Sequence, residues 1–166
     1  MPLLIRKIKK RKWDKPEVSP GAADPPVPAE PVGDFCTDNN EISVWLIEED
    51  KANLARVVTA LSGAKTTNIS HFDYAIFDSQ IVLDLSLELK TTTGESPDDE
   101  ANGKWHRDIV VGTADNLCAL VKNIYNTCAK ERVPATDIRS NLRKAIGSGQ
   151  ITAERLTDQL RKDLSV

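Results

Sequence analysis

The sequence predicts an α/β fold of the α+β type. We expect a small mixed sheet of about four strands, two main helices and a C-terminal helical hairpin. Segments with a two-residue apolar period alternate along the chain with segments of helical period. Their order is β-α-β-β-β-α, followed by two short helices. With 40% hydrophobic and 28% charged residues in a chain of 166, the composition is typical of one globular domain.

Charge divides the chain into three parts. Residues 1–15 carry seven Lys or Arg and one Asp, for a net charge of +6, and are predicted to be a basic N-terminal arm. Residues 16–33 carry three acidic residues, no basic ones and many prolines, which predicts an extended Pro-rich linker. Residues 34–166 carry 15 basic and 21 acidic residues, for a net charge of −6, and are predicted to form a single α/β domain with a helical tail.

The expected domain begins with a strand, a helix and a hairpin. Both faces of residues 41–49 are apolar, which favours a central strand covered on each side. Residues 51–64 follow with helical spacing and a glycine near their end. Residues 71–78 alternate weakly and residues 81–90 alternate cleanly between apolar and polar. We therefore expect two strands here, joined by a hairpin turn over the short segment between them.

The rest of the domain is predicted from the same periods. In order we expect a polar loop of 14 residues, a strand, a long helix and two short helices, at 91–104, 105–112, 113–132, 135–149 and 151–164. Thr113 and Thr152 are placed to cap the long helix and the last helix. Cys118 and Cys128 fall on the apolar stripe of the long helix, so both are expected to be small buried residues.

Cysteine and histidine usage argues against several classes of protein. The chain has three cysteines, with no CxxC pair, and two histidines. That pattern supports neither a disulfide framework nor a closed zinc site. No apolar run approaches the roughly 20 residues that span a bilayer, and the basic N-terminus lacks the apolar region of a secretory signal. We expect a cytoplasmic protein with no cofactor.

One constellation suggests an enzyme. Asp78 precedes Glu88 and Lys90 by the length of a hairpin, and the last two share one face of the expected strand. The arrangement loosely resembles the PD-(D/E)xK class of nucleases over about residues 50–130. The resemblance implies a Mg²⁺ ion held by the carboxylates, with the lysine stabilising charge near the attacking water. The competing and preferred interpretation is a solvated strand face with a Glu–Lys pair.

The basic run is the strongest functional signal, because six of the seven residues from Arg6 to Lys12 are basic. It suits a docking peptide, a nucleic-acid contact, a membrane-surface peptide, an added edge strand or a solubilising tail. An acidic domain repels phosphate backbones, so nucleic acid would have to bind through the arm. The residues predicted to bind a protein partner or nucleic acid are Arg6, Lys7, Lys9, Lys10, Arg11, Lys12 and Trp13.

The sequence names no reaction. The triplet His106-Arg107-Asp108 matches the catalytic loop of protein kinases, but no glycine-rich loop accompanies it. We therefore expect a non-enzymatic adaptor in which the arm, on its tether, and the acidic domain bind a protein partner. Trp45, Trp105, His106 and the polar loop are the expected partner surface. The alternative function is the small Mg²⁺-dependent nuclease, with the arm holding nucleic acid.

Overall fold

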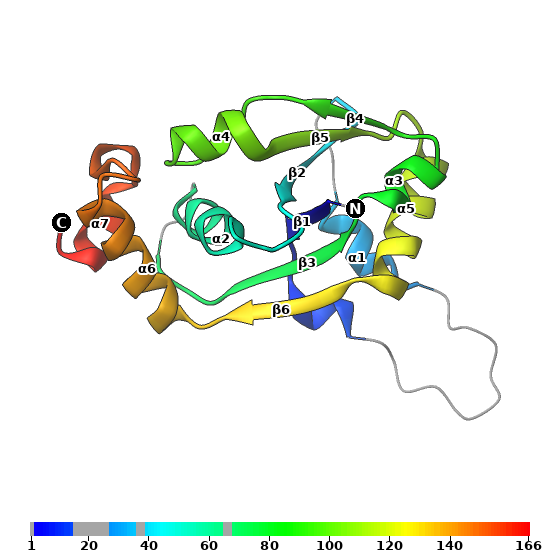
Figure 1. Ribbon diagram of the computed structural model, residues 1–166. Helices are drawn as coiled ribbons and strands as arrows, with labels where there is room; N and C mark the ends of the chain where they lie inside the picture. Colours follow the sequence, from blue (N-terminus) through cyan, green and yellow to red (C-terminus); the bar gives the residue numbers. More distant parts are fainter. Residues whose placement is uncertain (1, 15–26, 36–38, 65–67) are drawn as a thin grey trace.

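The computed structural model describes residues 2–14, 27–35, 39–64 and 68–166. It confirms the α/β class, with one antiparallel sheet in the order β4-β5-β2-β1-β3-β6 and helices on both faces (Figure 1). The sheet has six strands, more than the four or so expected, and its pairs are antiparallel where a mixed sheet was predicted.

The described elements lie as follows. The strands are β1 (Leu3–Lys7), β2 (Glu41–Ile47), β3 (Phe72–Asp78), β4 (Glu88–Thr91), β5 (His106–Val110) and β6 (Ala129–Val133). The α-helices are α1 (Ala29–Gly33), α2 (Leu54–Gly63), α3 (Gln80–Asp84), α4 (Asp99–Trp105), α5 (Ala114–Thr127), α6 (Ala135–Gly147) and α7 (Asp158–Leu164). Two 3₁₀ turns, η1 (Lys10–Trp13) and η2 (Ala153–Arg155), complete the set. No described helix is long and apolar enough to cross a membrane.

Strand β1 corrects the predicted domain boundary at residue 34. It lies inside the sheet between β2 and β3, and Leu4 is opposite Leu46 on one side and Phe77 on the other. Leu4 and Ile5 are fully buried. The first residues of the expected arm are therefore part of the domain, as an interior strand and not as an added edge strand.

Each face of the sheet packs against its own group of helices (Figure 1). One apolar cluster joins the sheet to α2, α4, α6 and α7, and includes Ile5, Trp45, Val57, Leu142 and Leu160. The other joins it to η1, α3 and α5, and includes Leu4, Trp13, Phe35, Val82 and Ile124. Successive residues of β1 point into opposite clusters because side chains alternate across a strand. This double burial fixes the basic segment to the body of the protein.

The expected strand 81–90 is wrong in its first half, and so is the hairpin before it. The Asp78 carboxylate accepts the Gln80 backbone N–H at 2.8 Å, and α3 begins there. Ser86 adopts φ of +53°, a left-handed conformation that interrupts extended pairing. The chain therefore resumes as a strand only at β4, on the edge of the sheet. Leu83, expected on the buried face, is 55% exposed.

Three other predicted segments also change. The second half of the polar loop is helix α4, because the buried carboxylate of Asp98 caps it by accepting the Ala101 N–H at 3.0 Å. The long helix ends at Thr127, and β6 follows as the second edge strand. The expected linker 16–33 contains the short helix α1, while residues 15–26 lie outside the described residues.

The helix caps and cysteines are partly as predicted. Thr113 caps α5 by accepting the Asn116 N–H at 3.2 Å, which confirms that cap. The last helix is instead capped by Thr157, and Thr152 makes no side-chain cap. Cys118 is exposed and Cys128 is half-buried, so neither is the buried residue expected. Cys118 lies on the solvent side because the buried stripe of α5 runs through Leu120, Val121 and Ile124.

Candidate functional site: a basic groove beside strand β1

The chain leaves β1 and turns back at η1, and the carboxylate of Asp34 holds this turn. One oxygen of that carboxylate accepts the Lys9 backbone N–H at 2.8 Å and the Trp13 indole N–H at 2.9 Å. The Asp34 backbone carbonyl accepts a hydrogen bond from Arg6 Nε at 3.0 Å. These bonds give the basic segment one conformation, which a free arm would lack.

Trp13 anchors the turn through its buried indole ring. Its ring is fully buried, with ring centroids 5.6 Å from Phe35 and 5.8 Å from Tyr125. The carbonyl oxygen of Trp13 also accepts a hydrogen bond from the Lys130 ammonium. Trp13 is therefore a structural residue, and its buried ring is not presented for stacking on a base or for contact with a partner as the sequence predicted.

Asp73 holds the other side of the same turn. It is buried, accepts the Lys10 backbone N–H at 3.1 Å and receives two hydrogen bonds from Arg132, at 2.7 and 2.9 Å. Burial alone would raise the pKa of this carboxyl, but the hydrogen bonds from Arg132 and Lys10 outweigh it, and the pKa is lowered. Asp73 is thus ionised at neutral pH, and its charge is compensated by Arg132.

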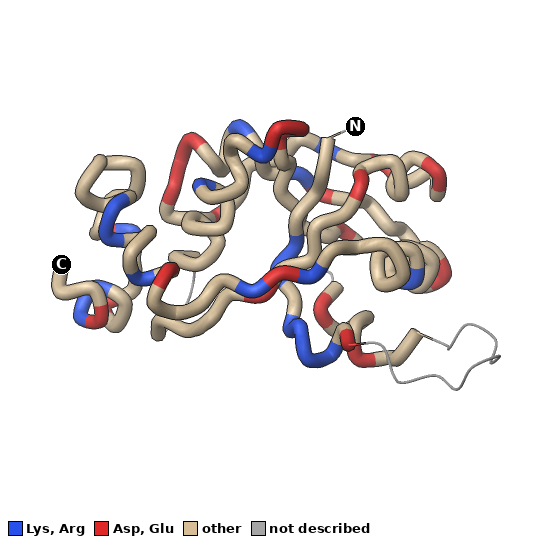
Figure 2. Tube along the Cα trace, turned by 60° about the horizontal axis from the view of Figure 1, so that its bottom comes forward, with Lys and Arg blue, Asp and Glu red and all other residues tan. Residues whose placement is uncertain are grey.

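A groove of about 410 Å³ opens beside this turn, and we call it the basic groove. Its lining residues come from the end of β1 and the segment after it, from the start of β3 with the residue before it, and from β6: Lys7, Ile8, Lys9, Arg11, Lys12, His71, Asp73 and Arg132. Five cations and one carboxylate leave a formal charge of +4 with His71 neutral. Figure 2 shows the Lys/Arg run as a blue stretch at the bottom of the view.

Four of the cations that line the groove are not paired with a described carboxylate. Within the described part of the chain, Lys7, Lys9, Arg11 and Lys12 form no ion pair with a carboxylate. The ammonium of Lys7 lies 5.8 Å from the centre of the Phe72 ring, a cation–π contact. The two carboxylates that bond to this run, Asp34 and Asp73, are already occupied by backbone N–H groups, Trp13 and Arg132. The groove therefore offers unpaired positive charge on a fixed backbone.

The predicted binding residues divide by position. Lys7, Lys9, Arg11 and Lys12 line the groove, but Arg6 faces the other side of the sheet, where its guanidinium packs 5.2 Å from the Phe35 ring. Lys10 belongs to η1 and does not line the groove. His71, Asp73 and Arg132 are additional residues of this site that no sequence pattern predicted. Only the pairing of β3 with β1 and β6 brings them there.

The expected partner surface is buried. Trp45, Trp105 and His106 are 4%, 5% and 6% exposed, so they do not form an exposed surface, and their contact with a partner stays a prediction. The Trp105 indole N–H lies 3.3 Å from a Glu48 carboxylate oxygen, and the Arg56 guanidinium lies 5.5 Å from the centre of its ring. These contacts make Trp105 part of the packing between α4 and the sheet.

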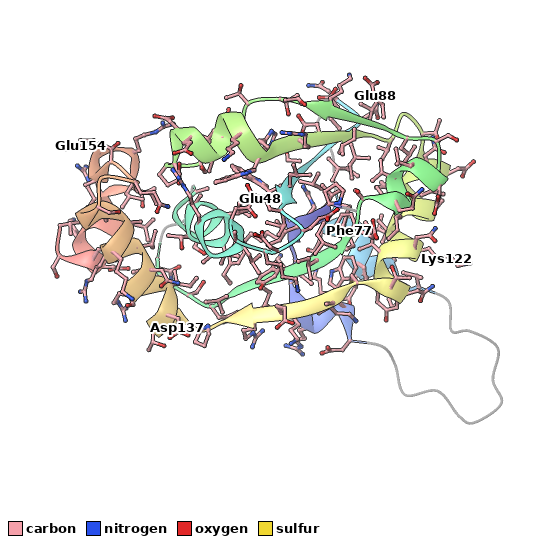
Figure 3. All side chains as sticks on the ribbon, in the orientation of Figure 1. Glu48, Phe77, Glu88, Lys122, Asp137 and Glu154 are labelled. Atoms are coloured by element: carbon pink, nitrogen blue, oxygen red, sulfur yellow. The ribbon has the colours of Figure 1, made fainter. Side chains whose placement is uncertain are left out.

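The nuclease constellation does not come together. Asp78 ends β3, whereas Glu88 and Lys90 lie on β4, and β5, β2 and β1 separate these strands. At about 4.8 Å per strand, the two positions lie roughly 19 Å apart across the sheet, far beyond the reach of one metal ion. Figure 3 shows Glu88 on the outer edge of the molecule, away from Phe77 beside Asp78.

Two further observations concern the predicted nuclease residues. Lys90 pairs with Glu41 at 3.0 Å, as the solvated-face interpretation expected for a Glu–Lys contact, although with a different glutamate. The described residues contain no group of three or more His, Cys, Asp or Glu side chains placed to hold a metal ion.

In comparisons with known proteins, no family model, no curated protein and no solved structure matches the chain.

Proposed function

We propose that the protein is a non-enzymatic interaction protein that binds an acidic segment of a protein partner in the basic groove. The unpaired cations of the groove carry this proposal. Charges that are not used inside a fold are free for a ligand of opposite sign. Since the backbone beneath Lys9, Arg11 and Lys12 is held by Asp34 and Asp73, little ordering is needed when a ligand binds.

An acidic protein segment fits the groove better than nucleic acid does. Proteins that bind single strands combine cations with aromatic rings on which bases stack. The one tryptophan beside this groove, Trp13, is fully buried, and the Phe72 ring under Lys7 is buried as well. The rest of the chain, from residue 34 onward, carries a net charge of −6 from 15 basic and 21 acidic residues, and it repels a long phosphate backbone. Carboxylate side chains need neither stacking nor a long track.

The cellular setting is part of the proposal. Cys118 and Cys128 form no disulfide, which is usual in the reducing cytoplasm. We therefore place the interaction there. The tether predicted between the basic run and the rest of the chain falls largely on residues 15–26, outside the described residues. The proposed binding element is the groove, and it requires no freely moving arm.

Binding of a fluorescein-labelled poly-glutamate peptide to the full chain, followed by fluorescence anisotropy, tests this function. A single-stranded oligonucleotide of the same net charge is measured in parallel, at low and high salt. We expect the peptide to bind more tightly than the oligonucleotide, with an affinity that falls as salt rises. The double variant Lys9→Glu with Arg11→Glu should weaken peptide binding about ten-fold or more, about 1.4 kcal/mol.

The matched control places the same two reversals elsewhere. Lys122 on α5 and Lys162 on α7 are also exposed lysines, and Lys122→Glu with Lys162→Glu should leave the affinity unchanged. Tighter binding of the oligonucleotide would make the groove a nucleic-acid site. Equal losses in both double variants would show that only the overall charge of the protein matters. Absence of binding to either probe would end the proposal.

A further inference from the structure

A second pocket lies on the same sheet, between β2, β5, the end of α2 and the segment after β4. Its volume is about 440 Å³, and the lining residues are Ser43, Trp45, Leu61, Ala64, Thr93, Gly94, Glu95, Ser96, His106 and Asp108. No described lining residue is cationic, whereas two carry carboxylates. The rings of Trp45 and His106 meet edge to face with centroids 5.2 Å apart and an interplanar angle of 80°. The pocket is therefore acidic and has an aromatic wall.

Hydrogen bonds at the base of this pocket determine the tautomer of His106. The Thr92 hydroxyl lies 2.7 Å from Asp108 Oδ2 and 2.8 Å from His106 Nδ1. An ionised carboxylate only accepts, so the single hydroxyl proton points to Asp108. His106 Nδ1 must then carry the hydrogen that binds the Thr92 oxygen. In the neutral ring, this leaves a lone pair on Nε2.

The neutral ring is also favoured by its surroundings. Burial lowers the pKa of His106, and the opposing attraction of Asp108 does not reverse this effect. At neutral pH Nε2 is consequently a hydrogen-bond acceptor, not a donor. It lies 3.9 Å from Asp108 Oδ1, too far for a hydrogen bond between them.

Neither His106 Nε2 nor Asp108 Oδ1 has a hydrogen-bond partner among the described residues. His106 and Asp108 are 6% and 8% exposed, yet Nε2 and Oδ1 form no hydrogen bond with any described residue. In the described part of the chain, every fully buried side-chain nitrogen or oxygen has a hydrogen-bond partner. The two free acceptors must therefore be open to solvent, and the pocket that both residues line is their opening.

We propose that this pocket binds a primary ammonium group, held between His106 Nε2 and Asp108 Oδ1 with its alkyl chain against Trp45. A nitrogen at about 2.9 Å from each acceptor spans their 3.9 Å separation without strain. Its three N–H groups supply the donors that both atoms lack, and its charge neutralises Asp108. Trp45, Leu61 and Ala64 provide an apolar wall for a short chain.

The spacing argues against a metal ion. Zinc holds nitrogen and oxygen ligands at about 2.0–2.1 Å, so two ligands of a tetrahedral site lie roughly 3.3 Å apart. The observed 3.9 Å between Nε2 and Oδ1 is wider than that. A neutral hydroxyl can donate to only one of the two acceptors and leaves the carboxylate charge unpaired.

Gly94 shapes the mouth of the pocket. A Cβ atom at this position would lie 2.9 Å from Cζ2 of Trp45 and 3.0 Å from Cδ2 of His106. Only glycine allows the backbone this close to both rings without displacing them. The backbone N–H of Gly94 is fixed by the Asn102 carbonyl at 3.2 Å. The position of the imidazole thus depends on a backbone contact that any larger residue disturbs.

Calorimetric titration of the full chain with butylammonium tests the site, with 1-butanol as the uncharged match. Nα-acetyl-lysine N-methylamide separates the two sources of the same chemistry, a free amine and a lysine side chain of a protein. We expect both ammonium probes to bind and butanol to bind at least about ten-fold more weakly. Tighter binding of the lysine probe would identify a protein side chain as the ligand, and equal binding a free amine.

Asp108→Asn removes the charge but keeps an oxygen that accepts from Thr92. Butylammonium should bind this variant about ten-fold more weakly, while Asp137→Asn, at an exposed carboxylate on α6, should bind as the wild type does. ¹⁵N NMR of wild-type His106 provides a readout that needs no variant, and the Nε2 signal should shift on saturation. Equal binding of butanol, unchanged affinity in Asp108→Asn, or an unmoved Nε2 signal would each overturn the proposal.

Discussion

The basic groove and the His106 pocket are built on one sheet and differ in the charge that they leave unpaired. In the groove, the carboxylates of Asp34 and Asp73 accept hydrogen bonds from backbone N–H groups, Trp13 and Arg132, whereas Lys7, Lys9, Arg11 and Lys12 form no ion pair with a described carboxylate. In the pocket no described residue supplies a cation, and Asp108 keeps one free oxygen. Each site is thus defined by the charged atoms that form no ion pair or hydrogen bond within the described part of the protein.

This difference separates structural from available charges. Asp98 shows the structural extreme, since it is fully buried and accepts from Arg56, Gln150 and the Ala101 N–H. A carboxylate so satisfied has no capacity left for a ligand. Asp108, with one free oxygen, has such capacity. A count of acidic or basic residues cannot distinguish these cases, whereas a count of their unused hydrogen bonds can.

The largest expected effect concerns the anchor of the groove. Trp13→Ala should lower the free energy of unfolding by about 3–5 kcal/mol, because it empties a fully buried indole site and removes one of the two described donors to the Asp34 carboxylate. Chemical denaturation measures the loss. Trp13→Phe is the matched control, since it keeps a ring between Phe35 and Tyr125 and should cost much less. A cost below about 1 kcal/mol for the alanine variant would mean that the basic segment is not anchored.

The next effect concerns the pocket. Gly94→Ala should lower the free energy of unfolding by about 1–3 kcal/mol, because its Cβ meets the rings of Trp45 and His106 at 2.9–3.0 Å. Gly103→Ala is the control, since Gly103 lies in α4 with nothing within 4 Å of its Cβ. That change should raise stability by up to about 1 kcal/mol. Thermal unfolding compares the two, and equal effects would contradict the close approach at Gly94.

A smaller effect, with a pH dependence, is expected at Asp73. Its pKa is lowered in the folded protein, so its contribution to stability is fully present above the ordinary value of about 3.9 and is lost as pH falls through the folded pKa. Asp73→Asn should therefore cost about 1 kcal/mol near neutral pH and less below about pH 4. Urea unfolding over this pH range measures the difference.

Asp84→Asn provides the reference for this pH series. Asp84 is exposed, and within the described ranges it accepts a hydrogen bond only from Gln80, four residues earlier. The stability difference between Asp84→Asn and the wild type should therefore stay near zero at every pH. If Asp73→Asn behaves in the same way, the bonds from Arg132 and Lys10 do not fix the groove.

The smallest effect on stability is expected from the groove cations themselves. Lys9→Glu with Arg11→Glu should change the free energy of unfolding by no more than about 0.5 kcal/mol, because neither side chain has a partner to lose among the residues that the structure describes. Differential scanning calorimetry checks this. A much larger loss of stability would assign Lys9 and Arg11 a structural role. It would contradict the distinction between Trp13, which anchors the segment, and the cations, which are available for binding.

The fold class and several elements could be predicted from local pattern. β2, α2 and β3 follow from apolar period alone, and the Thr113 cap follows from its place before a helical stripe. The clean alternation of residues 81–90 was misleading, because the Asx turn at Asp78 and the left-handed Ser86 override it. Such local bonds are not visible in an apolar/polar pattern.

The sites depended on long-range pairing that no local pattern contains. Leu4 and Ile5 precede the basic run and Ile8 lies within it, so the charges around these residues favoured the prediction of an arm. All three are buried in the structure. Asp73 and Arg132 reach the groove only through pairing of β3 with its neighbours. The free atoms of His106 and Asp108 become visible only when the position of Thr92 is known.

The most direct test of the central claim is to map where an acidic ligand binds. Amide chemical shifts of the ¹⁵N-labelled full chain are followed during titration with the poly-glutamate peptide. The largest changes should fall at Lys9, Arg11, Lys12 and His71 and on β6 near Arg132, while α7 and the residues around Lys122 stay unchanged. Changes spread evenly over exposed lysines, or absent from the segment after β1, would contradict the claim that the fold presents this run as a binding groove.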